Sequence, residues 1–548
     1  MRGRIVLVAA LMLATRSPAD TRVSNLSEAP AGYSEVDSYA TATSFTTGPA
    51  PAGTWASSWA LNSITVLVGT STDARASVGL RADNAGSPGA LLYVTNVDLF
   101  FPASSAPLTA YVGGVLLRPN TKYWVTLGET PGFGDFQWWV TGSANQSSPS
   151  SWTIGDDTQS SSDGGQTWLC CSFGAQMFSI DATPAPDLAV ADYTRRAILR
   201  VDRATGNRTV ISGCIDAGCT SEVGTGRSFG APLGVVQLNG NSIVVADADP
   251  NGPALIRVAL ATGNRTLVTG CNPGCGTGVG AGRDMVYPYD VSTLGSSLFA
   301  VDYSFGDANG ALASVNLATG NRTTVSGCID DACSSLVGSG RNFVGPVGII
   351  RDLTTNPTSL LVVERAFPSG SPLGVTHVDP ANGNRTVVSG CVDVGCTTIA
   401  GSGPMFIAPN IGDYYSGALV VPDSGLQAIV GVDLATGNRN IFSGCSDPSC
   451  TSQVGSGPAF TSPLTAKLAT NNSEILVADA NFPGILSVDL FNGNRTVVSS
   501  ASVGSGPLGI PTGMTELPEP GRLSGLAASL AVLALLATRR RTRARRVR

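Results

Sequence analysis

The sequence predicts an all-β protein: an N-terminal β-sandwich, then a six-bladed β-propeller, then a single hydrophobic helix at the C-terminus. Three observations predict it. Short runs of Val, Ile, Leu and Thr are bounded by Gly, Asn and Asp, and only 13% of the residues are charged. One segment recurs six times at intervals of 54 to 63 residues. No long amphipathic helical pattern separates the short strands.

The chain of 548 residues exceeds the length of one ordinary domain, and we divide it into four parts. These are a signal peptide over residues 1–19, a β-sandwich over 33–182, a propeller over 187–516, and a sorting or anchor segment over 518–548.

The N-terminus has the three parts of a secretory signal. Arg2 and Arg4 supply the charged region, residues 5–14 supply an apolar core, and Ser17-Pro18-Ala19 supplies a small-residue cleavage site. The apolar core is too short to span a bilayer as a stable helix. The sequence therefore predicts an exported protein, and a buried N-terminal strand is the alternative.

Residues 33–182 lack the repeat. Alternating apolar and polar residues at 63–68, 123–127 and 137–141, separated by Gly, Ser and Pro turns, predict strands of a β-sandwich. Segments 44–48, 116–124 and 162–168 resemble a choice-of-anchor domain, a group that is paired with varied surface-sorting tails and has no known chemistry. Residues 183–186, Thr-Pro-Ala-Pro, predict a short stiff linker into the propeller.

The repeat is marked by a turn of the form Ala-Thr-Gly-Asn-Arg-Thr. Its glycines are Gly206, Gly263, Gly320, Gly383, Gly437 and Gly493. Each unit contains an apolar strand that ends in an acid, an alternating strand, the Gly-Asn hairpin turn, a Thr/Val strand, and a Cys- and Gly-containing loop before a short strand. Four strands per unit predict a propeller blade.

The phase of the repeat predicts how the ring closes. Asp187 enters at the second strand of a unit, so the first blade lacks its opening strand. Residues 504–514 parallel residues 224–234 and would supply that strand, which removes the open edges of the ring. The Val-Ala-Asp strand end, followed by a turn and an Ile-containing strand, resembles NHL-type propeller repeats, although the Asn-Arg-Thr turn and the cysteine loop depart from that pattern.

Ten of the twelve cysteines form local pairs in the same loop of five repeats. The predicted disulfides are Cys214–Cys219, Cys271–Cys275, Cys328–Cys333, Cys391–Cys396 and Cys445–Cys450. Zinc is the competing interpretation, but it needs four converging ligands and the chain has one histidine, His377. The sequence leaves open whether the adjacent Cys170 and Cys171 are free or bridged to each other.

Each unit carries one acid at the end of its apolar strand. These acids are Asp192, Asp247, Asp302, Glu364, Asp423 and Asp479. An acid required in every blade predicts a structural role, such as accepting N–H bonds from a turn. Asp247, Asp249 and Asn251 have the oxygen spacing that begins a calcium loop, but Val258 stands where the closing Glu would be. The spacing favours an ordinary turn, with calcium at these three residues as the one metal prediction, and no other cofactor is expected.

The Asn-Arg-Thr triplets fit the N-glycosylation acceptor pattern. Their asparagines are Asn207, Asn264, Asn321, Asn384 and Asn494. The triplets fall in the hairpin turn of the repeat, which explains them structurally, and we expect no glycan on them.

The C-terminus has the pattern of a sorting signal. Pro518, Glu519 and Pro520 precede an apolar run over 523–538, and Arg539 begins a basic tail. This order resembles the PEP-CTERM sorting signal, which implies an exosortase-type membrane enzyme as a partner and a transient transmembrane anchor. A permanent single-span anchor is the alternative.

The charge of the mature body excludes one class of partner. Subtracting Arg2, Arg4, Arg16 and the seven arginines from Arg539 onward leaves 23 of the 33 basic residues against 39 acidic ones, a net charge near −16. Only Lys122 and Lys467 are lysines. The mature body is therefore a poor nucleic-acid binder.

These features predict an exported, cell-surface or matrix-associated propeller that acts as a non-catalytic binding or scaffolding module. The resemblance to PEP-CTERM proteins implies an exopolysaccharide or another surface protein as its partner. The alternative is a propeller hydrolase of the lactonase kind with a metal in the central channel. Such an enzyme needs acids that differ between blades, and only Glu364 and Glu222 depart from the repeat pattern in that way. A purely structural coat protein is a third hypothesis. The sequence names no ligand, because propeller sites lie in variable loops.

Overall fold

The computed structural model describes residues 21–517 apart from 37–38, 52–54, 70–73, 100–104, 131–132, 144, 150, 172–173, 304–309, 331, 352–358, 366–372, 394 and 471–472. The described residues form strands and turns without a helix, as the all-β prediction requires. None of them belongs to a helical segment with the length and apolar character of a membrane span. The predicted signal over 1–19 and the segment over 518–548, with Pro518, Glu519 and Pro520, lie outside the described residues.

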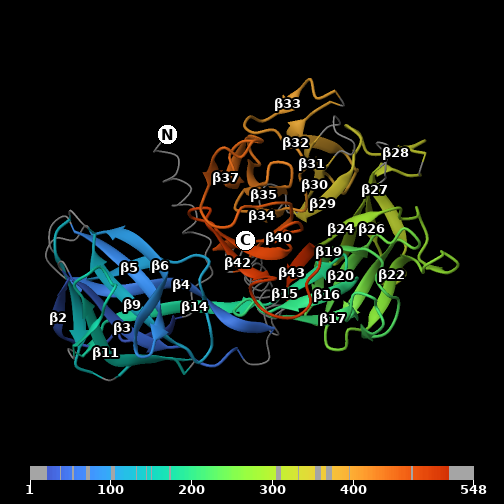
Figure 1. Ribbon diagram of the computed structural model, residues 1–548. Helices are drawn as coiled ribbons and strands as arrows, with labels where there is room; N and C mark the ends of the chain where they lie inside the picture. Colours follow the sequence, from blue (N-terminus) through green and yellow to red (C-terminus); the bar gives the residue numbers. More distant parts are fainter. Residues whose placement is uncertain are drawn as a thin grey trace, which may run out of the picture.

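The N-terminal part consists of two antiparallel sheets that share one hydrophobic core (Figure 1, blue to cyan). The first sheet contains β1 (Thr21–Ser24), β2 (Pro30–Val36), β4 (Ala56–Gly69), β7 (Ala106–Tyr111), β8 (Leu116–Leu117), β10 (Phe136–Thr141), β13 (Ala175–Gln176) and β14 (Phe178–Pro186). The second contains β3 (Ala40–Thr46), β5 (Arg75–Asn84), β6 (Ser87–Asp98), β9 (Lys122–Glu129), β11 (Thr153–Ser161) and β12 (Leu169–Cys171). Strands β4, β9 and β10 contain the three alternating segments identified in the sequence.

The predicted linker over 183–186 is wrong. These residues continue strand β14, which pairs with β4 as far as Pro186. Proline fits a strand where its nitrogen need not donate to the ladder, and it biases the preceding residue toward extended backbone, so a Pro-rich segment can be a strand as well as a linker. The sheets also begin at Thr21, before the predicted start of the domain at Tyr33.

The rest of the described chain forms six sheets, the blades of a propeller. Blade 1 contains β43 (Pro511–Glu516), β15 (Leu188–Asp192), β16 (Ala197–Val201), β17 (Arg208–Cys214) and β18 (Glu222–Val223). Blade 2 contains β19 (Pro232–Asn239), β20 (Ser242–Asp247), β21 (Ala254–Ala259), β22 (Arg265–Cys271) and β23 (Gly278–Val279). Blade 3 contains β24 (Pro288–Leu294), β25 (Ser297–Asp302), β26 (Ala311–Val315), β27 (Arg322–Cys328) and β28 (Leu336–Val337).

The other three blades follow the same order from the inner strand outward. Blade 4 contains β29 (Pro346–Arg351), β30 (Leu360–Glu364), β31 (Gly374–Val378), β32 (Arg385–Cys391) and β33 (Ile399–Ala400). Blade 5 contains β34 (Asp413–Tyr415), β35 (Ala418–Asp423), β36 (Ala428–Asp433), β37 (Arg439–Cys445) and β38 (Gln453–Val454). Blade 6 contains β39 (Pro463–Leu468), β40 (Glu474–Asp479), β41 (Gly484–Asp489) and β42 (Arg495–Ser500).

Five blades have a fifth strand that the sequence did not predict. It is two residues long, lies after the cysteine loop, and pairs with the last residues of the fourth strand, as Cys214 pairs with Glu222. Blade 6 has four strands because its loop is shorter and contains no cysteine pair. The Ser500 hydroxyl accepts hydrogen bonds from the backbone amides of Ser502 and Val503 and so closes this loop.

The ring closes as the sequence predicts. The last described strand, β43, pairs antiparallel with β15 and becomes the inner strand of blade 1. Figure 1 shows β43 in red beside the green strands β15 and β16. Because the chain's end completes its first blade, neither of these strands is left as an open edge.

The propeller core is divided among the blade interfaces. One buried cluster joins Leu188 and Val190 of blade 1 to Leu476 and Ile485 of blade 6, and Met514 of the closing strand lies within it. Similar clusters lie between blades 1 and 2, 2 and 3, 3 and 4, 4 and 5, and 5 and 6. The blades therefore depend on one another for burial of apolar surface.

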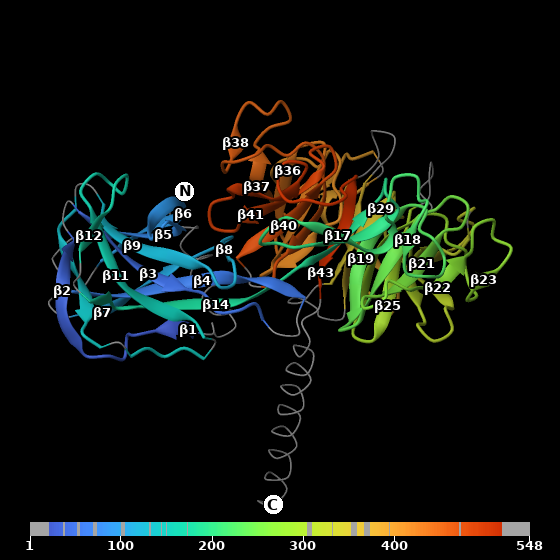
Figure 2. The ribbon, with the colours of Figure 1, turned by 60° about the horizontal axis from the view of Figure 1, so that its bottom comes forward.

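The N-terminal sheets contact the propeller near blade 1 and blade 6, and the two bodies lie beside each other in Figure 2. Strand β14 leads directly into β15, and the Asp187 amide donates to the Trp55 carbonyl at 2.8 Å. The Ser57 hydroxyl lies 2.6 Å from the Asp187 carboxylate and 2.9 Å from that of Asp202. A Cβ added at Gly113 would lie 3.0 Å from the Phe491 ring, so blade 6 is also in close contact.

Candidate functional site

The repeated acids hold the loop that enters each blade. In blade 3 the Asp302 carboxylate accepts hydrogen bonds from the backbone amides of Val286 (3.0 Å) and Tyr287 (2.7 Å), which precede the inner strand. The same kind of contact is made by Asp192, Asp247, Glu364, Asp423 and Asp479. The predicted role of these acids as acceptors of turn N–H bonds is therefore confirmed, and their oxygens are already engaged.

The predicted calcium residues lie in a turn that faces a cation of the protein itself. Arg227 lies 3.0 Å from Asp247 Oδ2 and 3.7 Å from Asp249 Oδ2. Asp247 Oδ1 also accepts from the Ala231 amide, and Asp249 Oδ1 accepts from the Asn251 amide at 2.9 Å. Burial raises the pKa of Asp247 to about 6, although the amides and Arg227 oppose that shift. Calcium at Asp247, Asp249 and Asn251 stays a prediction.

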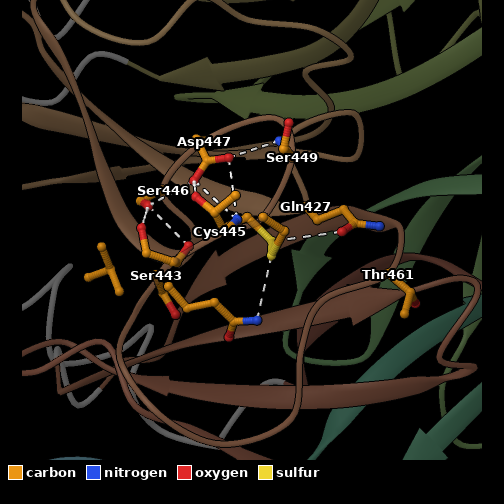
Figure 3. Close-up of a disulfide and its surroundings, with 12 residues drawn as sticks. Gln427, Ser443, Cys445, Ser446, Asp447, Ser449 and Thr461 are labelled. Atoms are coloured by element: carbon orange, nitrogen blue, oxygen red, sulfur yellow. Dashed lines mark hydrogen bonds between the residues drawn. A yellow bond between two sulfur atoms is a disulfide. The ribbon is translucent and has the colours of Figure 1, made fainter.

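Five cysteine pairs lie at disulfide distance, with Cα atoms 4.7 to 4.9 Å apart. They are the five pairs predicted from the sequence. Figure 3 shows the loop of blade 5, where the Cys445 sulfur lies 3.7 Å from Gln427 Oε1 and the Ser449 amide donates to Asp447 at 3.0 Å. The second cysteine of each pair has positive φ, 51° at Cys450, a conformation the short loop requires.

We expect removal of one such pair to lower stability modestly. Replacing Cys445 and Cys450 together by serine opens a loop of about six residues, and the chain-entropy model gives a loss of about 2 kcal/mol. Urea unfolding of the oxidised variant and parent measures it. A reductant is expected to lower the parent's midpoint further, because it opens all five loops. Unchanged midpoints in both comparisons would contradict the assignment of structural disulfides.

The remaining cysteines and the histidine are placed as follows. Cys170 and Cys171 lie in strand β12, which pairs with β11. His377 lies in β31, opposite Leu361 and Thr386, and is partly exposed. His377 is thus an ordinary residue of a blade strand.

The arginine of the Asn-Arg-Thr turn joins neighbouring blades, a role that the sequence interpretation missed. Arg265 of blade 2 donates to the Ser212 hydroxyl (3.0 Å) and the Val223 carbonyl (2.8 Å) of blade 1. Arg208 of blade 1 likewise donates to Ser499 of blade 6 at 2.6 Å. The six arginines at this position are buried: Arg208, Arg265, Arg322, Arg385, Arg439 and Arg495. Their recurrence in all six repeats was the available signal.

The asparagine of the same turn also contacts the neighbouring blade. Asn264 Oδ1 accepts from the Thr225 amide at 2.9 Å, and Asn207 Oδ1 accepts from the Ser505 amide at 2.8 Å. Gly206 has a φ of 74°, whereas Asn207 does not have positive φ. Asparagine is present because its side chain bridges two blades.

The inner strands contact one another around the propeller axis. Five of these strands have Gly234, Asp290, Gly348, Thr465 and Gly513 as their third residues. In blade 5, where β34 begins later, Ile411 lies at the equivalent position and bridges to Thr465. A Cβ at Gly234 would lie 2.6 Å from the Asp290 Cα, and one at Gly513 would lie 2.9 Å from the Gly234 Cα. Glycine is needed at Gly234 and Gly513 because the neighbouring backbones approach so closely there.

Asp290 is the one acid among these six axial positions. Its carboxylate accepts from the Ile349 amide of the next blade at 3.0 Å. Burial raises its pKa to about 6, and Lys467 opposes that shift. The axial positions thus offer a single carboxylate, which is already bonded.

Four tyrosines gather at the channel mouth, the end of the ring where the loops enter the inner strands. We call Tyr193, Tyr287, Tyr289 and Tyr303 the tyrosine cluster. The rings of Tyr287 and Tyr289 are 6.2 Å apart between centroids, and Tyr303 lies 6.2 Å and 6.3 Å from these two. Burial and the neighbouring tyrosines, Tyr193 first among them, raise the pKa of Tyr287 to about 12, so its hydroxyl stays protonated.

Small residues make room beside this cluster. Ala231, Leu233 and Ala248 of blade 2 pack against Tyr287 and Tyr289. On the other side, a Cβ at Gly345, where φ is 63°, would lie 2.5 Å from the Tyr303 ring. Tyr193 is 40% exposed, so part of the cluster reaches solvent.

Arg365 adds a charge to the tyrosine cluster. Its Nη1 donates to Asn410 Oδ1 at 2.8 Å, and its guanidinium hydrogen-bonds to the Tyr289 hydroxyl. Asn410 is buried and donates to the Ala408 carbonyl at 2.9 Å. The mouth therefore combines aromatic faces with a guanidinium held in place, an arrangement suited to a polar ligand with flat apolar faces.

The channel mouth was not predicted from the sequence, although a signal was present. The residue after each blade acid changes from blade to blade: Tyr193, Ala248, Tyr303, Arg365, Ser424 and Ala480. A variable position on an otherwise uniform repeat marks a surface that specific ligands can use.

Comparison with known proteins gives fold likenesses at low identity. The sequence matches no protein-family model and no curated protein. Solved structures similar to it include a nidogen/laminin complex (12% identity, 60% of this chain and 97% of that one, TM-score 0.39). A Bacteroides thetaiotaomicron protein of unknown function shares 12% identity over 81% of this chain and 86% of that one, with a TM-score of 0.38. A putative 6-phosphogluconolactonase from Bacteroides uniformis shares 12% identity over 60% and 99%, with a TM-score of 0.36.

Proposed function

We propose that this protein is an exported, cell-surface or matrix-associated glycan-binding propeller without catalytic activity. The observation that carries the proposal is the tyrosine cluster with Arg365 at one mouth of the ring. Tyrosine rings offer flat apolar faces to the C–H side of a sugar ring, and their hydroxyls offer hydrogen bonds to its polar edge. An exopolysaccharide is the partner that this chemistry favours over another surface protein.

The residues at the axis support a binding role over the alternative of a hydrolase with a metal in the channel. A divalent metal requires several converging oxygen ligands. The six axial positions supply Asp290 and Thr465 beside three glycines and Ile411, and the blade acids are bonded to amides. The hydrolase stays a prediction that no contact among the described residues favours.

Export and surface sorting rest on the sequence of the two ends. Five cysteine pairs at disulfide distance support export, because such pairs persist in oxidising compartments. We propose that an exosortase-type enzyme acts at Pro518, Glu519 and Pro520, and that the N-terminal pair of sheets is a choice-of-anchor-like β-sandwich.

We expect Tyr193→Ala combined with Tyr287→Ala to weaken polysaccharide binding by at least about tenfold, since each aromatic contact contributes about 1 kcal/mol. Binding of the full chain to a panel of matrix polysaccharides by microcalorimetry measures this loss. The matched control is Tyr111→Ala, since Tyr111 is 41% exposed, close to Tyr193, but lies in β7 of the N-terminal sheets. Equal binding by the parent, the double variant and the control would contradict the proposed site. No binding by the parent would contradict the proposed function.

A further inference from the structure

We propose that the glycan bound at the channel mouth is acidic and that Arg365 binds its carboxylate. This inference rests on the proposed glycan-binding function and names the chemical class of the ligand, a hexuronate polymer. It starts from the difference between Arg365 and the arginines that pair with the blade acids.

Two arginines that lie beside blade acids are paired with them. Arg227 lies 3.0 Å from Asp247, and Arg341 lies 2.6 Å from Glu364. Arg365 forms no ion pair with a carboxylate in the described part of the chain; its partners there are Asn410 and Tyr289. A guanidinium that is partly buried beside aromatic rings without a counter-charge is incompletely stabilised, and a carboxylate from outside would supply that charge.

The surroundings of Arg365 do not neutralise it. The adjacent acid in the chain, Glu364, is bound to Arg341 and to the Val344 amide at 2.9 Å. Glu364 is buried, and burial raises its pKa against the effect of Arg341. The Glu364 carboxylate is therefore bonded to Arg341 and the Val344 amide, and it does not serve as the counter-charge of Arg365.

The guanidinium is also held in place before a ligand arrives. Asn410 is buried and is itself bonded to the Ala408 carbonyl, and the Tyr289 hydroxyl contacts the guanidinium from a second direction. A guanidinium has five N–H donors, so two contacts leave donors for a bidentate carboxylate. Little conformational entropy then remains to be lost on binding.

A hexuronate fits both parts of the mouth at once. Its ring has a C–H face for the tyrosine cluster, and its carboxylate lies on the ring edge, where Arg365 can reach it. Among the residues after the blade acids, Arg365 is the one with a charge, so blade 4 differs from the other five at this position.

The test compares three polymers on the full chain: polygalacturonate (carboxylate), dextran (neutral) and dextran sulfate (sulfate ester). We expect polygalacturonate to bind at least about tenfold more tightly than dextran or dextran sulfate, a charged hydrogen bond being the difference. Arg365→Gln is expected to remove that preference and Arg365→Lys to restore part of it, since lysine lacks the bidentate geometry. Arg257→Gln, an exposed arginine on β21, is the matched control and should leave it unchanged.

The outcomes separate the two proposals. If dextran binds as tightly as polygalacturonate, or if Arg365→Gln keeps the preference, the acidic ligand is wrong while glycan binding stands. If dextran sulfate binds as tightly as polygalacturonate, the mouth selects charge rather than a carboxylate, and the inference is overturned. If the parent binds none of the polymers at a site sensitive to Tyr193→Ala with Tyr287→Ala, the proposed function itself fails.

Discussion

A chain that ends at Ile510 is expected to lose the cooperative unfolding transition of the propeller, because it lacks the closing strand β43. Met514 is 0% exposed and Leu517 is 1% exposed. Removing one buried side chain of this size costs about 2–5 kcal/mol. With both removed and β15 left unpaired, we expect a loss of at least about 5 kcal/mol, enough to open the ring at room temperature.

The closing strand of blade 1 also contacts two other blades, blades 2 and 6, which is why its loss should spread. Thr512 donates to the Pro232 carbonyl of blade 2 at 2.9 Å, and the Thr465 hydroxyl of blade 6 donates to the Thr512 carbonyl. Glu516 accepts from the Thr470 amide at 3.0 Å. Each contact joins elements that are far apart in the sequence. The entropy cost of bringing those elements together is therefore offset by all of these contacts jointly, and removing β43 removes them all.

The matched control is a chain that ends at Leu517. It keeps β43 and the hydrogen bond that the Leu517 amide donates to the Asp187 carbonyl (2.7 Å). Urea unfolding monitored by tryptophan fluorescence compares the two chains. Equal midpoints and equal slopes would show that the ring does not depend on its closing strand, and the description of a closed propeller would then be wrong.

Closure of the ring could be predicted because two segments of the same sequence are equivalent. Residues 504–514 resemble residues 224–234, and a unit that starts at its second strand needs its first from elsewhere. The blade acids could be predicted for the same reason, since a residue repeated in every blade serves something that every blade has. Repetition therefore reveals the structure that the blades share.

The contacts between blades could not be predicted in this way. The repeat shows that Arg265 and Arg322 are equivalent, but it does not show that each reaches the strand of the preceding blade. The fifth strand was missed because a two-residue bridge has no periodicity to detect. The channel mouth was missed because its residues are departures from the repeat, and departures acquire meaning only when the ring brings them together.

Departures also mark the junction of blade 1, blade 6 and the N-terminal sheets. Where blades 2, 3, 5 and 6 have leucine after the third strand (Leu260, Leu317, Leu434 and Leu490), blade 1 has Arg203. Arg203 forms ion pairs with Glu474 of blade 6 and, at 3.0 Å, with Glu516 of the closing strand. Its side chain and that of Glu474 are buried, and Nη1 lies 3.4 Å from the Pro186 carbonyl of β14.

Arg203→Leu is therefore expected to destabilise the protein by about 3–5 kcal/mol, even though it installs the residue that the repeat prefers. The reason is that removing one partner leaves two carboxylates buried without a counter-charge. Urea unfolding at pH 8 measures the loss. The matched control is Leu434→Met in blade 5, a volume-conserving change at the equivalent position, which is expected to cost less than about 1.5 kcal/mol.

The pH dependence separates this charge effect from a packing defect. Burial raises the pKa of Glu516 to about 7, against the effect of Arg203, so the folded state binds more protons than the unfolded state between about pH 4.5 and 7. The contribution of this carboxyl to stability therefore falls as the pH rises through that window. Without Arg203 the pKa of Glu516 in the folded state is expected to rise further, so the pH window over which stability falls extends upward. The loss of stability caused by Arg203→Leu should therefore be large at pH 8, where the buried carboxyl must ionise without its partner, and small at pH 5. Adding Glu474→Ser and Glu516→Gln to Arg203→Leu removes both carboxylates and should restore most of the stability at pH 8. A loss that is the same at both pH values, and that the triple variant keeps, would mean that Arg203 acts by filling space rather than by pairing two buried acids.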